Sequence, residues 1–301
     1  MKALRLFCLL LLCSASGLLQ AGDAAALRAR HLALAETLAN NPFQRPLYLE
    51  STHGDSLLQG DIYAELEQPF SQAGPALQGA EQWCDLLILH LNVKGCQASG
   101  TAAQARLKLH VGRKFDQPLA DAYPFEFRYR VEAAQSDYLR VLLAAPQGPL
   151  GTQDYRIVLE VLALDARRSF LHLSYAYRYG VAANLAMQGY LATGGRGKVG
   201  FSIVGKSANG EPQYLGGMRG VIERNTMRYY LAIDAYLGAL SLPAAARLDK
   251  RLNDWHSGTE RYPRQLQELD RALAGLPRAA KEAFLLAQLE GLSYAQIAER
   301  L

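Results

Sequence analysis

The sequence has few cysteines, little excess charge, and none of the short motifs that mark the common enzyme classes. Its six histidines show no metal-ligand spacing such as HExxH, and no GxSxG nucleophile elbow is present. The glycine-rich stretch at 194–198 lacks the spacing and the Lys-Ser/Thr ending of a P-loop. These absences argue against a metalloprotease, an α/β-hydrolase and a P-loop nucleotide-binding protein. We therefore expect a protein without enzyme activity, cofactor or metal.

Charge is also limited. The formal net charge is +4 over 301 residues, whereas a nucleic-acid binder more often shows a concentrated basic face. Half of the residues are apolar and a fifth are charged, which is the balance of a folded globular protein. The length allows one large domain or two ordinary ones.

The N-terminus has the pattern of a secretory signal peptide. Lys2 and Arg5 precede the apolar run 6–12, which is followed by small residues and a possible cleavage point after Ala21. The run is too short for a comfortable membrane span, and an uncleaved anchor is the alternative. We expect residues 1–21 to be a signal peptide and the protein to be periplasmic or secreted.

Two cysteines, Cys84 and Cys96, remain after that cleavage. An even pair in an exported chain suggests one disulfide, with two buried free thiols as the alternative.

The body of the chain begins with helical patterning. Residues 24–40 are predicted to form a helix with apolar positions at Leu27, Leu32, Leu34 and Leu38. Strands are expected at 46–51 and 57–66, and a second helix at 75–88, with Pro75 in its first turn and Leu77, Trp83 and Leu87 in the core.

Period-two alternation then predicts an antiparallel sheet that is covered on one side. The expected strands are 106–111, 125–131, 138–144, 155–164 and 170–179. His110 and His172 fall on their polar faces, where we expect solvated or hydrogen-bonded side chains. A short helix at 182–191, a last strand at 198–204 and a long helix at 219–240 complete this part.

This order of elements predicts an α+β fold, an antiparallel sheet with a long C-terminal helix. It resembles the helix-grip fold of START-like lipid-transfer proteins over about residues 46–240. That resemblance implies an apolar cavity between sheet and helix, which a lipid or other apolar ligand could occupy. Its candidate lining residues are Phe125, Phe127, Tyr129, Tyr175 and Tyr177. The alternative is that these aromatic side chains simply fill a core.

Charged residues on the long helix suggest two further features. Arg219 and Glu223 lie one turn apart, so an exposed ion pair is plausible there. Arg224 or Arg228 could lie at the mouth of a pocket.

The last part of the chain has a separate pattern. Residues 246–264 are polar and are interpreted as a linker between a domain at 24–245 and a helical tail at 265–301. In the tail, Gly275 and Gly291 end two helices, and Ser293 with Gln296 forms a capping box for a third. A small all-α, helix-turn-helix-like unit is expected.

The tail sequences LDRALAGLP, KEAFLL and EGLSYAQIAERL resemble region 4 of extracytoplasmic-function sigma factors over residues 266–301. The resemblance implies promoter DNA and RNA polymerase as partners, and DNA binding through Ser293, Tyr294, Gln296 and Arg300. In that family a turn and a recognition helix follow, whereas this sequence stops at Leu301, and seven basic residues balance seven acidic ones from Arg251 on.

Two functions therefore remain open. The first is a sigma region 4-like protein whose DNA binding and transcription initiation are impaired, because the recognition helix is missing. The second is an exported, non-enzymatic envelope protein that binds a lipid or apolar ligand and carries a vestigial tail. Export conflicts with the cytoplasmic site of transcription. Either a gene fusion or frameshift, or an N-terminal segment that is not a working signal, would explain the conflict.

Overall fold

The structure, a computed structural model, describes residues 23–262 except 91, 102–103, 114–116 and 194–196. The expected signal peptide and the region 4-like tail lie outside these residues. The same holds for the DNA-binding candidates Ser293, Tyr294, Gln296 and Arg300.

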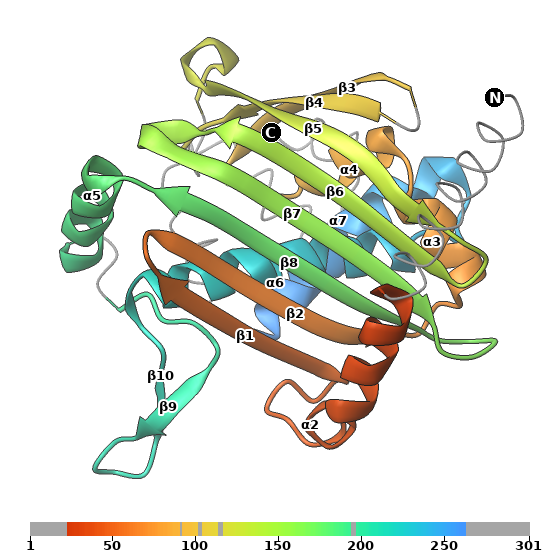
Figure 1. Ribbon diagram of the computed structural model, residues 1–301, viewed down its shortest axis with the longest axis horizontal. Helices are drawn as coiled ribbons and strands as arrows, with labels where there is room; N and C mark the ends of the chain where they lie inside the picture. The colour runs from red at the N-terminus through yellow and green to blue at the C-terminus, as the bar shows by residue number, and fades with distance from the viewer. Residues whose placement is uncertain (1–22, 91, 102–103, 114–116, 194–196, 263–301) are drawn as a thin grey trace, which may run out of the picture.

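An eight-stranded antiparallel sheet dominates the described chain (Figure 1). Its strand order is β1-β2-β8-β7-β6-β5-β4-β3, so the β1–β2 hairpin pairs with β8 from much later in the sequence. The strands are β1 (Leu47–Gly54), β2 (Leu57–Leu66), β3 (Val93–Gly100), β4 (Gln104–Val111), β5 (Tyr123–Ala134), β6 (Tyr138–Gln147), β7 (Thr152–Ala163) and β8 (Ser169–Tyr179).

Most of these strands follow the alternation in the sequence. In β4, for example, Leu107 and Leu109 are buried while Arg106 and Lys108 are exposed. Alternation does not predict the edge strand β3, because most of its residues are small or polar and none of them is buried. The β1–β2 turn consists of Asp55 and Ser56, both with positive φ (43° and 64°), as in the two-residue hairpins that match strand twist.

Helices cover the inner face of the sheet, which holds the main core. They are α3 (Phe70–Leu77), α4 (Ala80–Leu87), α6 (Gly217–Gly238) and α7 (Ala244–Glu260). The predicted helix at 75–88 is therefore wrong in its bounds. Gly79 is extended (φ −96°, ψ 142°) and separates α3 from α4, and Pro75 lies inside α3. Leu77, Trp83 and Leu87 are buried as expected.

The long helix α6 confirms the predicted C-terminal helix. Its Glu223, however, is 0% exposed, so the expected exposed pair with Arg219 is wrong. Arg219 donates instead to the backbone oxygen of Ser51 at 2.6 Å. Arg224 and Arg228 are also buried.

The stretch expected to be a linker contains helix α7 over most of its described part. α7 packs against α6 and buries Trp255, and Tyr262 just beyond it is also buried in the main core. Only one side of α7 is buried, so most of its residues are polar. For that reason its composition predicts a linker and not a helix.

The last predicted strand differs in its bounds, whereas the predicted short helix is found nearly as expected. The last strand is β9 (Ile203–Lys206), and it pairs only with β10 (Pro212–Tyr214) in a separate hairpin that projects from the body (Figure 1). The predicted short helix is present as α5 (Val181–Ala192).

The N-terminal helix lies on the outer face of the sheet (Figure 1). Residues 23–33 are helical and α2 (Ala35–Ala39) continues them, in agreement with the predicted helix. Leu27, Leu34 and Leu38 pack against the outer-face rings of Tyr63 and Phe170. Leu32 is exposed, contrary to expectation.

Candidate ligand cavity

A cavity of about 470 Å³ lies on the inner face of the sheet. Strands β4, β5, β7 and β8 form its wall, and the end of α4, the start of β3, α5 and α6 enclose it from the other sides. This volume falls within the roughly 300–1,000 Å³ of small-molecule sites.

Aromatic side chains make up much of the wall. Phe125 contacts Phe127 and Tyr155, with ring centroids 4.6 and 5.1 Å apart. Tyr155 stacks on Tyr177 at 5.0 Å, and Tyr175 bridges to Tyr229 of α6 at 5.1 Å. The aromatic cluster is continuous from β5 to α6, and it places one large apolar surface around the hollow.

Tyrosine phenol groups supply polar atoms to the lining, together with the side chains of His90, Asn92, Thr152 and Asn225. Burial raises the pKa of Tyr155, Tyr175, Tyr177 and Tyr229 above the usual phenol value, so all four stay neutral. Tyr155 and Thr152 share a hydrogen bond of 2.9 Å. Within the described part of the chain, no hydrogen bond involves the phenol oxygens of Tyr175, Tyr177 or Tyr229. The wall therefore combines a large apolar area with hydroxyls that can donate or accept hydrogen bonds.

Helix α5 closes one side of the cavity. Its sequence VAANLAMQGYLA contains no charged residue, and Ala183, Ala186, Met187 and Tyr190 line the hollow. On the same helix, Val181 and Leu185 are exposed. Because small and apolar residues occupy its cavity side, α5 adds a wall without ionic groups.

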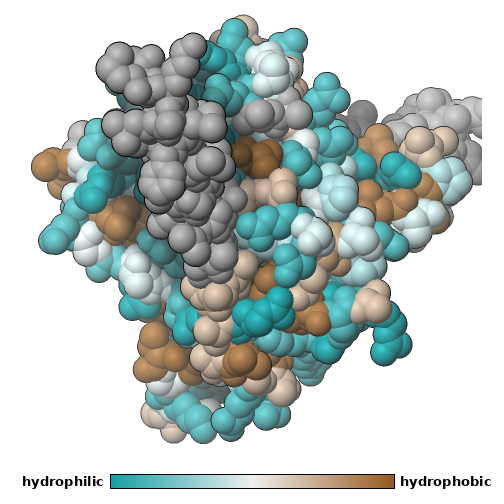
Figure 2. Space-filling view, turned by 45° about the vertical axis from the view of Figure 1, so that its right-hand side comes forward, coloured by the Kyte–Doolittle hydropathy of each residue, from teal (hydrophilic) through white to brown (hydrophobic). Residues whose placement is uncertain are grey.

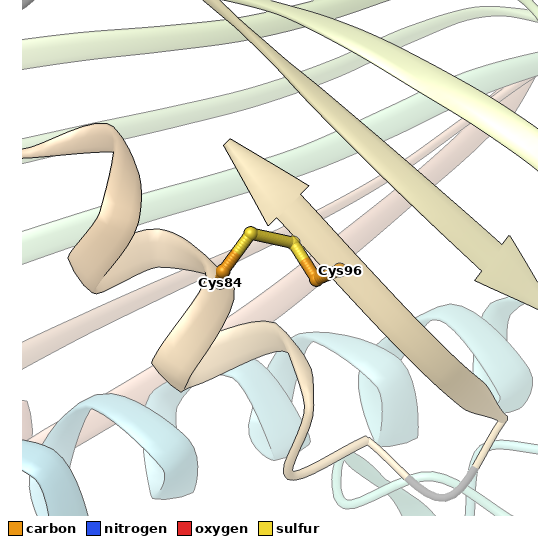
Figure 3. Close-up of a disulfide and its surroundings, with 2 residues drawn as sticks. All are labelled: Cys84 and Cys96. Carbon is orange, nitrogen blue, oxygen red and sulfur yellow. A yellow bond between two sulfur atoms is a disulfide. The ribbon is translucent and has the colours of Figure 1, made fainter. Parts of the chain in front are cut away.

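A disulfide lies beside the cavity. Cys84 of α4 and Cys96 of β3 are bonded, with an S–S distance of 2.00 Å (Figure 3). Leu87 on the same helix and Val93 on the same strand line the hollow. The cross-link therefore holds together two elements that form one side of the site.

Four of the five expected lining residues meet at this cavity, namely Phe125, Phe127, Tyr175 and Tyr177. Tyr129 does not line it, since its hydroxyl donates to the backbone oxygen of Gln78 beside α3. Sequence reasoning missed Tyr155, Tyr190 and Tyr229 as lining residues. Tyr155 could have been found, because it begins the alternating pattern of its strand, but nothing local marks Tyr190 or Tyr229.

Metal sites and membrane-spanning helices are both absent from the described residues. They contain no cluster of three or more His, Cys, Asp or Glu suited to a metal ion. No helix among them is long and apolar enough to cross a membrane. Figure 2 shows hydrophilic residues interspersed with small hydrophobic groups over the face in view.

Comparison with known families and sequences gives one match. Residues 266–301 match the family described as Sigma-70, region 4. No curated protein matches the sequence. The family match covers a small part of the chain, and it lies outside the residues that the structure describes.

Several solved structures are similar to the described domain. Human StAR-related lipid transfer protein 5 shares 8% identity over 71% of this chain and 94% of its own, with a TM-score of 0.35. A STAR-related lipid transfer protein from Xanthomonas axonopodis shares 12% identity over 44% of this chain and 75% of its own, with a TM-score of 0.32. An aromatase/cyclase from a Streptomyces species shares 10% identity over 44% of this chain and 73% of its own, with a TM-score of 0.31. Likenesses this distant assign no function to this chain.

Proposed function

We propose that this protein binds an apolar ligand with a few polar groups in the cavity between the sheet and α6. The observation that carries the proposal is the aromatic wall with the free phenol oxygens of Tyr175, Tyr177 and Tyr229. Burial of apolar ligand surface supplies the affinity, and the hydroxyls orient the polar end of the ligand. Lipids and polycyclic molecules have this chemistry. We propose binding rather than catalysis.

The proposal is tested by filling the cavity. Val221 of α6 lines the hollow and is half-buried, so Val221→Trp places an indole in the ligand volume. Val181→Trp is the matched control, because Val181 is 79% exposed on α5 and does not line the cavity. Titration of a fluorescent fatty-acid analogue should show saturable binding to the natural sequence and to Val181→Trp, and a loss of roughly tenfold or more in Val221→Trp. Equal affinities in all three proteins would refute the cavity as the site.

The family match at residues 266–301 supports a second candidate function, that of a sigma region 4-like protein whose DNA binding is impaired. We propose that this segment derives from sigma region 4, whose partners are promoter DNA and RNA polymerase. Because basic and acidic residues balance from Arg251 on, we expect no specific binding to a −35 element. A gel shift with full chain that depends on both salt and the −35 sequence would contradict this expectation.

Export is a separate proposal, supported by the N-terminal pattern alone. Cell fractionation with an antibody against the folded domain should find a shortened product outside the cytoplasm. A full-length cytoplasmic product would contradict export and favour a role near DNA.

A further inference from the structure

Arginines gather on the outer face of the sheet, opposite the cavity. We call Arg106 of β4, Arg128 and Arg130 of β5, Arg156 of β7 and Arg178 of β8 the arginine face; all five are exposed. The strand register aligns three of them in one row. Arg106 pairs directly with Arg128, Arg128 with Ala144, and Ala144 with Arg156.

The side chains surround a broad, shallow depression. Two adjoining hollows of about 650 and 450 Å³ share Arg128 and Ala144 in their linings. Small or apolar residues lie between the arginines, namely Leu142 and Ala144 of β6 and Ala176 of β8. A strand spacing of about 4.8 Å makes the face about 19 Å wide from β4 to β8. The positive charge is thus spread over a two-dimensional area rather than along a line.

Carboxylates balance only part of this charge. Arg106 pairs with Glu126 at 2.9 Å, Arg130 pairs with Glu132, and Arg178 lies 3.8 Å from Asp154. Arg128 and Arg156 make no ion pair or side-chain hydrogen bond with any described residue. Like charges directly opposite each other on neighbouring strands destabilise a sheet, so the Arg106–Arg128 pair costs stability in the isolated chain. An anionic partner would remove that cost.

The described chain leaves this face open. The helix at 23–39 packs at the other end of the outer face, over Tyr63 and Phe170. The aromatic rings at that end are therefore not available as a stacking platform for the bases of a single-stranded nucleic acid. A guanidinium matches the geometry of phosphate oxygens and binds them in pairs. A broad, two-dimensional array of such groups fits the headgroups of a lipid surface.

We propose that the arginine face docks the protein on an anionic phospholipid bilayer. This surface is distinct from the cavity, and the proposal stands whether or not the cavity binds a ligand. Each arginine near such a surface contributes electrostatic attraction that falls off within a Debye length, so docking weakens as salt rises.

The test uses the full chain and sedimentation with vesicles. At low salt the protein should sediment with phosphatidylglycerol/phosphatidylcholine vesicles and stay in solution with pure phosphatidylcholine. The variant Arg128→Gln/Arg156→Gln should lower the partition coefficient roughly tenfold or more, because two unpaired charges are lost. Arg28→Gln/Arg167→Gln removes the same charge from exposed positions outside the face and should bind nearly as the natural sequence does.

Three results would overturn the proposal. The first is no sedimentation with phosphatidylglycerol vesicles at low salt. The second is an equal loss in both double variants, which would assign binding to net charge and not to this face. The third is complete displacement from vesicles by a short DNA duplex at equal phosphate concentration, which would make nucleic acid the preferred partner. Circular dichroism of each variant should show unchanged folding, since neither removed arginine of the face has a partner to lose.

Discussion

Glu223 joins three segments of the chain through one buried carboxylate. Its Oε1 accepts hydrogen bonds from Ser51 Oγ of β1 at 2.8 Å and from Ser202 Oγ at 2.7 Å. Its Oε2 accepts from the backbone N–H groups of Phe201 and Ser202 at 2.7 and 3.0 Å. Glu223 thus ties α6 to the edge of the sheet and to the segment before β9.

Removing this carboxylate should destabilise the fold strongly. We expect Glu223→Ala to lower the free energy of unfolding by about 3 kcal/mol or more, because four donors lose a charged acceptor inside the protein. Glu211→Ala, at an exposed position between β9 and β10, is the control and should have little effect. Urea denaturation measures both. A loss in Glu223→Ala no greater than in the control would show that these hydrogen bonds add nothing to stability.

His172 lies between two buried carboxylates on the outer face. Its Nδ1 is 2.7 Å from Glu160 Oε2, and its Nε2 is 3.0 Å from Asp61 Oδ1. Burial by itself would lower the pKa of His172, but hydrogen bonds and charges from both carboxylates outweigh burial and raise it. Burial likewise would raise the pKa of Asp61 and Glu160, but the partners of each, His172 first, lower it.

These directions predict how stability depends on pH. The contribution of protonated His172 is complete below its unfolded pKa of about 6.5 and is lost as pH rises through the raised folded value. The contribution of the carboxylates is present above about pH 4 and is lost as pH falls through their lowered folded values. The part of the free energy of unfolding that comes from His172 and its two carboxylates should therefore be greatest between about pH 4.5 and 6.5 and fall toward pH 9.

Urea denaturation over this pH range tests the assignment to His172. The variant His172→Gln should be less stable at pH 6 and should lose most of the decline between pH 6 and 9. An unchanged decline in His172→Gln would assign the alkaline loss to other groups.

At the scale of elements, the position of α6 above the sheet decides whether a cavity exists. The helix approaches β2 closely because Gly60 has no side chain, and a Cβ there would lie 2.3 Å from Thr226 Oγ1. Further across the sheet, the rings of Tyr175 and Tyr229 stand between β8 and the same helix. The close contact of α6 with β2, together with the rings of Tyr175 and Tyr229, leaves the cavity on one side of α6.

A double-mutant cycle can test this close approach. Gly60→Ala should destabilise the protein by about 1–3 kcal/mol, because Thr226 must shift to admit the methyl group. In a Thr226→Ala background the same change should cost less, since the clashing oxygen is absent and the two effects are coupled. Thermal or urea denaturation of the four proteins gives the coupling, and additive effects would contradict the contact.

Sequence patterning located the elements of the sheet better than those of the helices. Four internal strands, β4, β5, β7 and β8, alternate in sequence, since one face of each is buried in the main core. Residues 75–88 carry a continuous apolar pattern, and only the extended backbone at Gly79 divides them into α3 and α4. Helix α7 falls in the predicted linker, because its residues are mostly polar and its contacts with α6 are tertiary.

At the scale of the whole molecule, one sheet separates two surfaces of opposite character. Its inner face holds the aromatic cavity, and its outer face holds the arginines. β2 pairs with β8 more than a hundred residues later, as in the pairing of Tyr63 with His172. Both surfaces are complete only when this long-range pairing has formed.

The cavity should not depend on the region 4-like segment. Among the residues that the structure describes, those that line it lie between Leu87 and Tyr229. We therefore expect a chain that ends at Tyr262 to bind the fatty-acid probe as tightly as the full chain. Fluorescence titration of both proteins measures this, and a weaker affinity in the shorter chain would show that residues 263–301 contribute to the site.

Local patterns in the sequence predicted the α+β class, the order of the main strands, the long α6 and four of the residues around the cavity. Period-two alternation and helical periodicity are local properties, so they can be read without the fold. Only the tertiary structure decided that Glu223 is buried, that Tyr155 and Tyr229 complete the wall, and that Arg106, Arg128 and Arg156 form one row. These features depend on which strands are neighbours and on how closely a helix approaches them. Such distances follow from packing between segments far apart in the chain, and no local pattern encodes them.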